Sequence, residues 1–174
     1  MEIITERLRL REYTQDDFDD LKEILTDEET MRFYPKPYDL DGVQRWLDWS
    51  MDNYRRYGFG LWAIELKKTG EFIGDCGLTM QNIDGESLPE IGYHINKRYW
   101  RKGYAKEACK AVKDWAFTNT EFDELYSYMN VDNVPSYSTA NANGMKRIKE
   151  YESDKEKDYV YMISRKEWEK ENER

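Results

Sequence analysis

Apolar residues recur along this chain with two different spacings. In residues 5–11 they alternate with polar residues, which predicts a half-buried strand. Residues 16–26 and 39–57 instead carry apolar residues three and four positions apart, as on one face of an amphipathic helix. Gly58 and Gly60 follow the second of these segments and end it. The chain is therefore expected to begin with a strand and two helices.

Strands and shorter helices alternate in the remainder. Two apolar runs, residues 61–66 and 71–78, flank a turn that ends with Gly70, which predicts a β-hairpin. A second turn over residues 82–87 leads to a third strand. The elements expected from there on are a strand over 89–95, a helix over 103–117, a strand over 124–131, a short helix over 132–143, a hairpin of 146–152 with 159–164, and a peripheral charged tail over 165–174.

This order, β-α-α-β-β-β-α-β-α-β-β, predicts an α/β (α+β) fold around one sheet. The length of 174 residues fits one domain with a sizeable core. We expect residues 1–174 to form a single domain. Its central twisted sheet should be mixed, mostly antiparallel, with about seven strands and about four flanking helices.

The composition narrows the choice of partners. Charged residues make up 36% of the chain and the net charge is −9, which argues against a nucleic-acid backbone as the main partner. The six Trp, 14 Tyr and six Phe supply enough apolar surface to exclude a disordered chain. No run is long enough to span a membrane and no apolar leader is present, so a cytoplasmic protein is expected. The acidic surface either attracts a cationic acceptor or only maintains solubility.

The two cysteines give no sign of a metal site. Cys76 and Cys109 stand singly in apolar patterns without Cys-x-x-Cys spacing. Buried free thiols are therefore expected, and neither a bound metal nor a disulfide.

The most informative stretch is residues 91–108. A strand ends near Ile95, a basic and aromatic connector follows, and a Gly-x-Ala step opens a helix. The first turn of a helix has main-chain N–H groups without partners and the positive end of the helix dipole, so a phosphate can bind there. Arg101, Lys102 and Lys106 would add positive charge. As a bare pattern, the same residues are also compatible with an ordinary helix start.

A family resemblance supports the anion site. Residues 89–95, Pro-Glu-Ile-Gly-Tyr-His-Ile, followed by Tyr-Trp-Arg-Lys-Gly-Tyr-Ala-Lys-Glu-Ala, resemble the acetyl-CoA-binding core of the GNAT superfamily. The similar branch is that of the ribosomal-protein-alanine N-acetyltransferases. Trp100, Gly103 and Ala105 fall on the three fixed positions of the Gln/Arg-x-x-Gly-x-Gly/Ala loop, with Trp100 departing from the general Gln/Arg. The resemblance extends from Thr5 to about Trp168.

The resemblance implies acetyl-CoA as cosubstrate and no metal. The pantetheine would pair with the main chain near the end of the 89–95 strand, and the pyrophosphate would bind the loop that opens the following helix. The implied contacts are His94, Ile95 and Asn96 for the pantetheine, and Arg101, Lys102, Gly103, Tyr104, Ala105 and Lys106 for the pyrophosphate.

A second constellation opens the short helix over residues 132–143. Asn133 and Ser136 there are ordinary helix-cap types. By resemblance, Asn133 would bind the pantetheine-proximal part of acetyl-CoA, and Ser136 would protonate the leaving thiolate. Many GNAT enzymes carry a tyrosine as general acid at the position of Ala140, so Ser136 or Tyr137 must substitute, or no dedicated acid exists. A non-catalytic acetyl-CoA-binding module is therefore the alternative to an enzyme.

Two further residues could act on the acceptor amine, which must be neutral to attack. Glu90 lies at the start of the 89–95 strand, on the same face as Gly92 and His94. By resemblance Glu90 is the expected base, and an exposed strand-end carboxylate is the alternative. His94 is the only histidine, and a packing role competes with proton transfer.

The acceptor itself is not identified by the sequence. The resemblance places its pocket against the 31–38 loop and the second helix, with Phe33, Tyr34, Trp46 and Glu90 as contacts. We expect direct acetyl transfer to a primary amine, either a protein N-terminus or a small molecule. The expected binding partner is this amine, and the protein could form a homodimer. Binding to nucleic acid or to a membrane is not expected.

Overall fold

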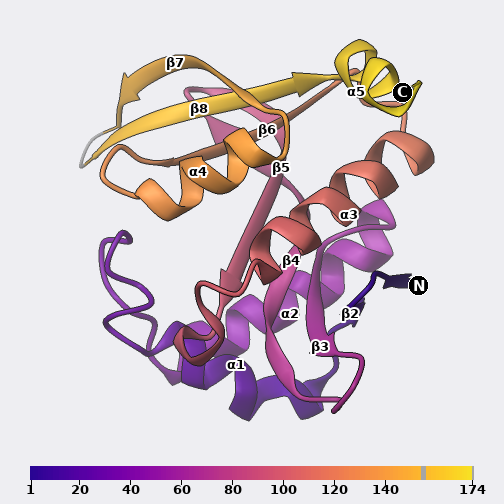
Figure 1. The fold of residues 1–174 in the computed structure, drawn as a ribbon. Coiled ribbons are helices and arrows are strands. Elements are labelled where there is room, and N and C mark those ends of the chain that lie inside the picture. Colours follow the sequence, from indigo (N-terminus) through magenta and orange to yellow (C-terminus); the bar gives the residue numbers. More distant parts are fainter. Residues whose placement is uncertain (154–155, 174) are drawn as a thin grey trace.

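One mixed sheet runs through the computed structural model, which describes residues 1–153 and 156–173 (Figure 1). Its eight strands lie in the order β1-β2-β3-β4-β5-β6-β8-β7. The pair β5–β6 is parallel, and the other neighbouring strands are antiparallel. The strands are β1 (Glu2–Ile4), β2 (Leu8–Glu12), β3 (Leu61–Leu66), β4 (Phe72–Ile83), β5 (Glu86–Ile95), β6 (Glu124–Asn130), β7 (Lys146–Glu152) and β8 (Lys157–Ser164).

Helices cover both faces of this sheet. The α-helices are α1 (Phe18–Leu25), α2 (Leu40–Tyr57), α3 (Tyr104–Asn119), α4 (Val134–Ala142) and α5 (Arg165–Asn172), with 3-10 turns η1 (Gln15–Asp17) and η2 (Lys97–Tyr99). Successive side chains of β3 point to opposite faces of the sheet, as in any strand. Leu61 and Ala63 join the core under α1 and α2, whereas Trp62 and Ile64 join the core under α3. No helix in the described part of the chain is long and apolar enough to cross a membrane.

The predicted α/β architecture is confirmed, with one more strand and one more helix than expected. The predicted first strand, residues 5–11, is in fact a turn followed by β2, and β1 precedes the turn. Thr5 makes the turn, because its main-chain N–H donates to Leu8 O at 2.9 Å and its hydroxyl accepts from Leu8 N–H at 3.0 Å. Residues 5–7, Thr-Glu-Arg, are all polar, and the alternation that predicted the strand is confined to residues 8–11, which lie in β2.

The β4–β5 hairpin is longer than the apolar runs predicted. Its register continues to Ile83 opposite Glu86. The two-residue loop between them is Asp84-Gly85, with φ of 50° and 86°. Two positive φ values are what a type I′ hairpin turn needs, and Asp-Gly supplies them at low cost. This turn lies within the predicted 82–87 turn.

The C-terminal hairpin of β7 and β8 is confirmed, and β8 inserts between β6 and β7. The charged tail forms α5, in which no residue is buried. Trp168 Nε1 donates to Asp114 on α3 at 2.8 Å, and Glu171 pairs with Lys113 at 2.9 Å. The tail thus lies at the periphery and is held to α3 by polar contacts.

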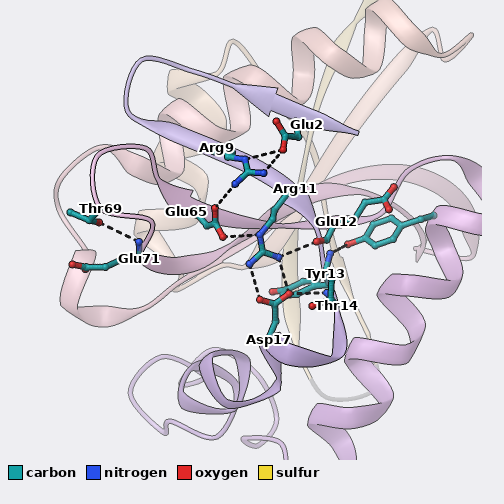
Figure 2. Close-up of polar contacts among 11 residues, drawn as sticks. Glu2, Arg9, Arg11, Glu12, Tyr13, Thr14, Asp17, Glu65, Thr69 and Glu71 are labelled. Carbon is teal, nitrogen blue, oxygen red and sulfur yellow. Dashed lines mark hydrogen bonds and ion pairs between the residues drawn. The ribbon is translucent and has the colours of Figure 1, made fainter.

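An ion network fixes η1 to the strands (Figure 2). The Arg11 guanidinium binds Asp17 at 2.8 Å and Glu65 at 2.7 Å. Hydrogen bonding to Asp17 and Glu65 raises the pKa of Arg11 above its ordinary value. Arg11 thereby joins β2, β3 and the start of α1.

Candidate acetyl-transfer site

A gap opens between β5 and β6. In the described residues one Cα pair joins the two strands, Glu90 with Tyr126. Just beyond it, Ser127 Oγ donates to Ile91 O at 2.9 Å. Main-chain groups alternate in direction along a strand, so Tyr93 and Ile95 also turn theirs toward the gap. Extended main chain that faces a gap in this way can pair with a strand-like ligand.

The residues predicted to contact the pantetheine differ in the direction of their main-chain groups. Ile95 faces the gap, where its carbonyl also accepts from Trp100 Nε1 at 2.7 Å. His94 and Asn96 turn the other way: His94 N–H donates to the Asp75 carboxylate at 3.0 Å, and Asn96 N–H donates to Ile73 O at 2.8 Å. The main chain of Tyr93 was not predicted as a pantetheine contact. Tyr93 lies two residues before Ile95, so strand alternation places its main-chain groups on the same edge of β5.

The gap leads to the N-terminus of α3. Gly103 is the N-cap residue, with φ of +80° and no side-chain cap, so the first main-chain N–H groups of the helix have no such acceptor. Arg101, Lys102, Gly103 and Lys106 are exposed, and Tyr104 and Ala105 are half-buried. This arrangement of exposed N–H groups, cations and a side-chain-free residue fits a pyrophosphate.

Arg7 and Glu107 hold this loop, and neither residue was predicted from the sequence. Arg7 Nη1 donates to Lys102 O at 2.9 Å, and its guanidinium lies 4.4 Å from the centre of the Tyr104 ring. Glu107 accepts from Thr5 Oγ1 at 2.7 Å, from Arg7 N–H at 2.8 Å and from Arg7 Nε at 2.7 Å. The turn after β1 therefore holds the loop that opens α3, although the two lie about a hundred residues apart in sequence.

A cavity of about 60 Å³ lies where the two strands diverge. Such a volume holds a few water molecules or a group of similar size. Its lining joins both faces of the sheet: Tyr34, Glu90, Ile91, Gly92, Tyr93, Cys109, Ser127, Tyr128, Ser136, Thr139, Ala140, Asn143 and Met145.

The α4 side of the cavity carries hydroxyl groups. Asn133 caps α4 by accepting from Ser136 N–H at 3.3 Å. Ser136 lines the cavity, as does the phenol of Tyr93, which hydrogen-bonds Thr139 at 3.3 Å. Burial raises the pKa of Tyr93 to about 12, so the phenol is protonated at neutral pH. Ser136 and Tyr93 therefore both bring a hydroxyl group to the cavity, and the Tyr93 hydroxyl donates to Thr139 Oγ1.

Tyr137 lies outside this cavity. Its ring is 5.8 Å from the Tyr159 ring and 6.5 Å from the Tyr161 ring, on the side of β8. Ala140 lines the cavity with a methyl group only. Of the hydroxyl groups considered from the sequence, Ser136 is the one at the cavity, and the structure adds Tyr93.

Glu90 enters the cavity from the face of α1 and α2. Burial raises the pKa of its carboxyl to about 8. The carboxylate folds over Gly92: a Cβ at that position would lie 2.8 Å from Glu90 Oε2. Gly92 thus leaves the space that the carboxylate occupies. A carboxyl group with a pKa near neutrality is suited to accept a proton.

Aromatic residues of the α1–α2 loop and of α2 surround the same face. Tyr34 lines the cavity, and its ring centre lies 5.6 Å from that of His94. The Trp46 ring centre lies 5.4 Å from that of His94. Phe33 is not among the cavity-lining residues; the Arg32 guanidinium lies over its ring at 4.8 Å. Tyr34 and Glu90 thus line the cavity, Trp46 contacts His94 on the same face without lining it, and Phe33 does not line it.

The cysteines are buried and free, as expected. Their Sγ atoms lie 3.8 Å apart, with Cys76 on β4 and Cys109 on α3. Among residues 1–153 and 156–173, no group of three or more His, Cys, Asp or Glu side chains could hold a metal ion.

Comparisons with known proteins identify the family. The model of the acetyltransferase (GNAT) domain matches residues 7–146. The Bacillus subtilis (strain 168) protein YkkB is 35% identical over 144 residues, or 82% of this chain and 84% of that protein. The Bacillus licheniformis protein p20, an N-acetyltransferase by name, is 30% identical over 173 residues, or 93% of this chain and 94% of its own.

The fold comparison agrees. The crystal structure of an acetyltransferase from Agrobacterium tumefaciens strain C58 superposes with a TM-score of 0.83 at 27% identity, covering 94% of both chains. These matches do not distinguish the ribosomal-protein-alanine branch from others. The chain belongs to the GNAT family of acetyltransferases and is an acyltransferase that uses acetyl-CoA.

Proposed function

We propose that this enzyme transfers the acetyl group of acetyl-CoA directly to a primary amine, with Glu90 as the base. The observation that carries the proposal is the cavity at the β5–β6 gap. Glu90 lies on its α1–α2 side, and the hydroxyls of Ser136 and Tyr93 lie on its α4 side. The amine and the thioester would meet between these groups.

The residues of the chain would divide the reaction as follows. Glu90, directly or through a water, takes a proton from the attacking amine nitrogen. The new N–C bond forms as the C–S bond breaks, and the departing thiolate takes a proton from the Ser136 hydroxyl, which regains one from water. The proton that Glu90 took from the amine returns to the solvent. Main-chain groups of Tyr93 and Ile95 and the first turn of α3 would hold the pantetheine and the pyrophosphate, so that proximity supplies a large part of the acceleration.

The acceptor is proposed as either a protein N-terminus, as in the ribosomal-protein-alanine branch, or a small amine. Both have a primary amine that must lose a proton before or during attack. The acidic chain, with a net charge of −9, would attract either as a cation. Membership of an acetyltransferase family favours an enzyme over the non-catalytic binding module.

Thiol release tests this proposal. The purified protein with acetyl-CoA is offered an alanine-initiated peptide pool and, separately, a pool of aliphatic amines, diamines and aminoglycosides. Thiol release with an acetylated product, identified by mass, in one pool is the expected result and selects the acceptor class. Release in neither pool would contradict the proposal.

The two hydroxyl donors can be separated by mutation. Ser136→Ala is expected to lower kcat about 10²-fold, because the leaving thiolate loses its proton donor, with the acetyl-CoA affinity unchanged. Tyr93→Phe is the second test, and Tyr137→Phe is the control because Tyr137 lies outside the cavity. If kcat falls in Tyr93→Phe and not in Ser136→Ala, Tyr93 rather than Ser136 is the proton donor to the thiolate. Lower thermal stability of Ser136→Ala at full turnover would make Ser136 only part of the helix start.

A further inference from the structure

His94 is held in a buried hydrogen-bonded chain. Its Nδ1 lies 3.0 Å from Asp75 Oδ1, and the same carboxylate accepts from the Tyr13 hydroxyl at 2.8 Å. Asp75 is fully buried, and His94 is 8% exposed. An ionised carboxylate can only accept hydrogen bonds, so beside an ionised Asp75 the contact places a proton on Nδ1. When the ring carries that one proton, Nε2 is left as an acceptor.

This acceptor has no partner. His94 Nε2 is buried without a hydrogen bond among the described residues. The ring lies between the Tyr34 ring, at 5.6 Å, and the Trp46 ring, at 5.4 Å. A buried polar atom left unpaired costs free energy, so it calls for an explanation such as a ligand.

His94 belongs to the same strand face as Glu90, although His94 itself is not among the cavity-lining residues. His94, Gly92 and Glu90 share one face of β5, and neighbouring positions on that face are roughly 7 Å apart. The Glu90 carboxylate folds over Gly92, which brings it one such step from His94. Tyr34 spans the two, because it lines the cavity with Glu90 and contacts the His94 ring.

We propose that Glu90 and His94 together bind the two N–H groups of a neutral primary amine. Such an amine has two hydrogens and one lone pair. When the carboxylate takes one hydrogen bond and Nε2 takes the other, the lone pair is left free for attack on the thioester. His94 is then an acceptor-binding residue that orients the nitrogen, and Asp75 fixes its tautomer. This inference rests on the proposed function and assigns the two residues that would select a primary amine over a secondary one.

The site would therefore discriminate against N-alkylated amines. A secondary amine has one N–H, so one of the two acceptors, the half-buried Glu90 carboxylate or the buried His94 Nε2, stays unpaired when it binds. Sites built to hydrogen-bond a substrate N–H reject analogues that lack it. We expect kcat/KM for the primary amine to exceed that for its N-methyl analogue by about 10²-fold or more.

His94→Asn tests this directly. The asparagine amide can still donate to Asp75 near the position of Nδ1, but it has no atom at Nε2. The probes are n-butylamine against N-methylbutylamine, and an alanine-initiated peptide against its N-methylalanine form. The variant is expected to keep the acetyl-CoA affinity, to lose at least tenfold in kcat/KM for the primary amine, and to reduce the primary-to-secondary preference at least tenfold.

A measurement on the unmodified protein provides a second readout. Because the chain contains one histidine, the ring ¹⁵N resonances need no assignment. We expect the Nδ1–H tautomer at neutral pH, and a shift of Nε2 when n-butylamine is added to the protein saturated with coenzyme A. A proton on Nε2 of the neutral ring, or no Nε2 shift, would overturn the proposal even if His94→Asn failed to fold.

The outcomes separate this inference from the function it rests on. Turnover by the wild type with an unchanged amine preference in His94→Asn would overturn only the role of His94. No thiol release from the wild type with any of the four probes or with the wider pools would remove the proposed function, and this inference with it.

Discussion

Gly103→Glu is expected to raise the dissociation constant of acetyl-CoA by about 10²-fold or more. The substitution places a carboxylate at the N-cap of α3, where the pyrophosphate would bind. Two like charges 4 Å apart repel by about 4 kcal/mol near a protein surface, which alone corresponds to that factor. The fold should persist, because a Cβ at Gly103 would meet only Arg7 Nη2, at 3.4 Å. Isothermal titration with acetyl-CoA measures the effect.

Gly70→Glu is the matched control. Gly70 has nearly the same backbone conformation, with φ of +77° against +80°, and open space around a Cβ. It lies in the β3–β4 turn, away from the α3 loop. The control therefore carries the same added charge and backbone strain without the phosphate site. Equal acetyl-CoA affinities in the two variants would remove the phosphate-loop assignment.

Glu90→Gln is expected to lower kcat/KM for the amine by about 10²–10⁴-fold with little change in acetyl-CoA affinity, because the glutamine cannot accept the proton. Burial raises the pKa of Glu90 to about 8, so the active carboxylate is lost as the pH falls through that value. The amine is protonated in the same range. Below both pKa values, log kcat/KM should fall with a slope of about two for the wild type and about one for the variant.

Glu86→Gln is the control for this pair, since Glu86 lies on the same strand and is exposed. Stability gives an independent readout. The folded protein holds the Glu90 proton more tightly than the unfolded chain, so its stabilising effect is full below the ordinary glutamate pKa and is lost as the pH rises through about 8. Glu90→Gln should remove that part of the pH dependence. An unchanged pH–rate profile and full turnover would leave Glu90 structural.

The sequence could predict what is local. The strand, basic turn and helix of residues 91–108 lie in one continuous stretch, and Gly103 opens α3 where the pattern placed a helix start. Glu90 and Ser136 were named from motifs, and the structure brings both to the same cavity. The helical spacing of three and four residues and the alternation of strands also predicted the long helices and most strands, because burial on one face dictates the spacing of apolar residues.

What the sequence could not predict depends on contacts between distant residues. The clamp of Arg7 and Glu107 joins positions a hundred residues apart, and nothing in either local pattern indicates it. The hydrogen bond of Asp75 to His94 required the register of β4 against β5. Phe33 and Tyr34 are neighbours in one loop, and only the folded loop shows that Tyr34 lines the cavity whereas Phe33 does not.

The most direct test of the central claim is isothermal titration of the wild-type protein with acetyl-CoA, with Gly103→Glu measured alongside. The account predicts one saturable site in the wild type and a large loss of affinity in the variant. If the wild-type protein did not bind acetyl-CoA, the assignment of residues 91–108 as the coenzyme site would be contradicted.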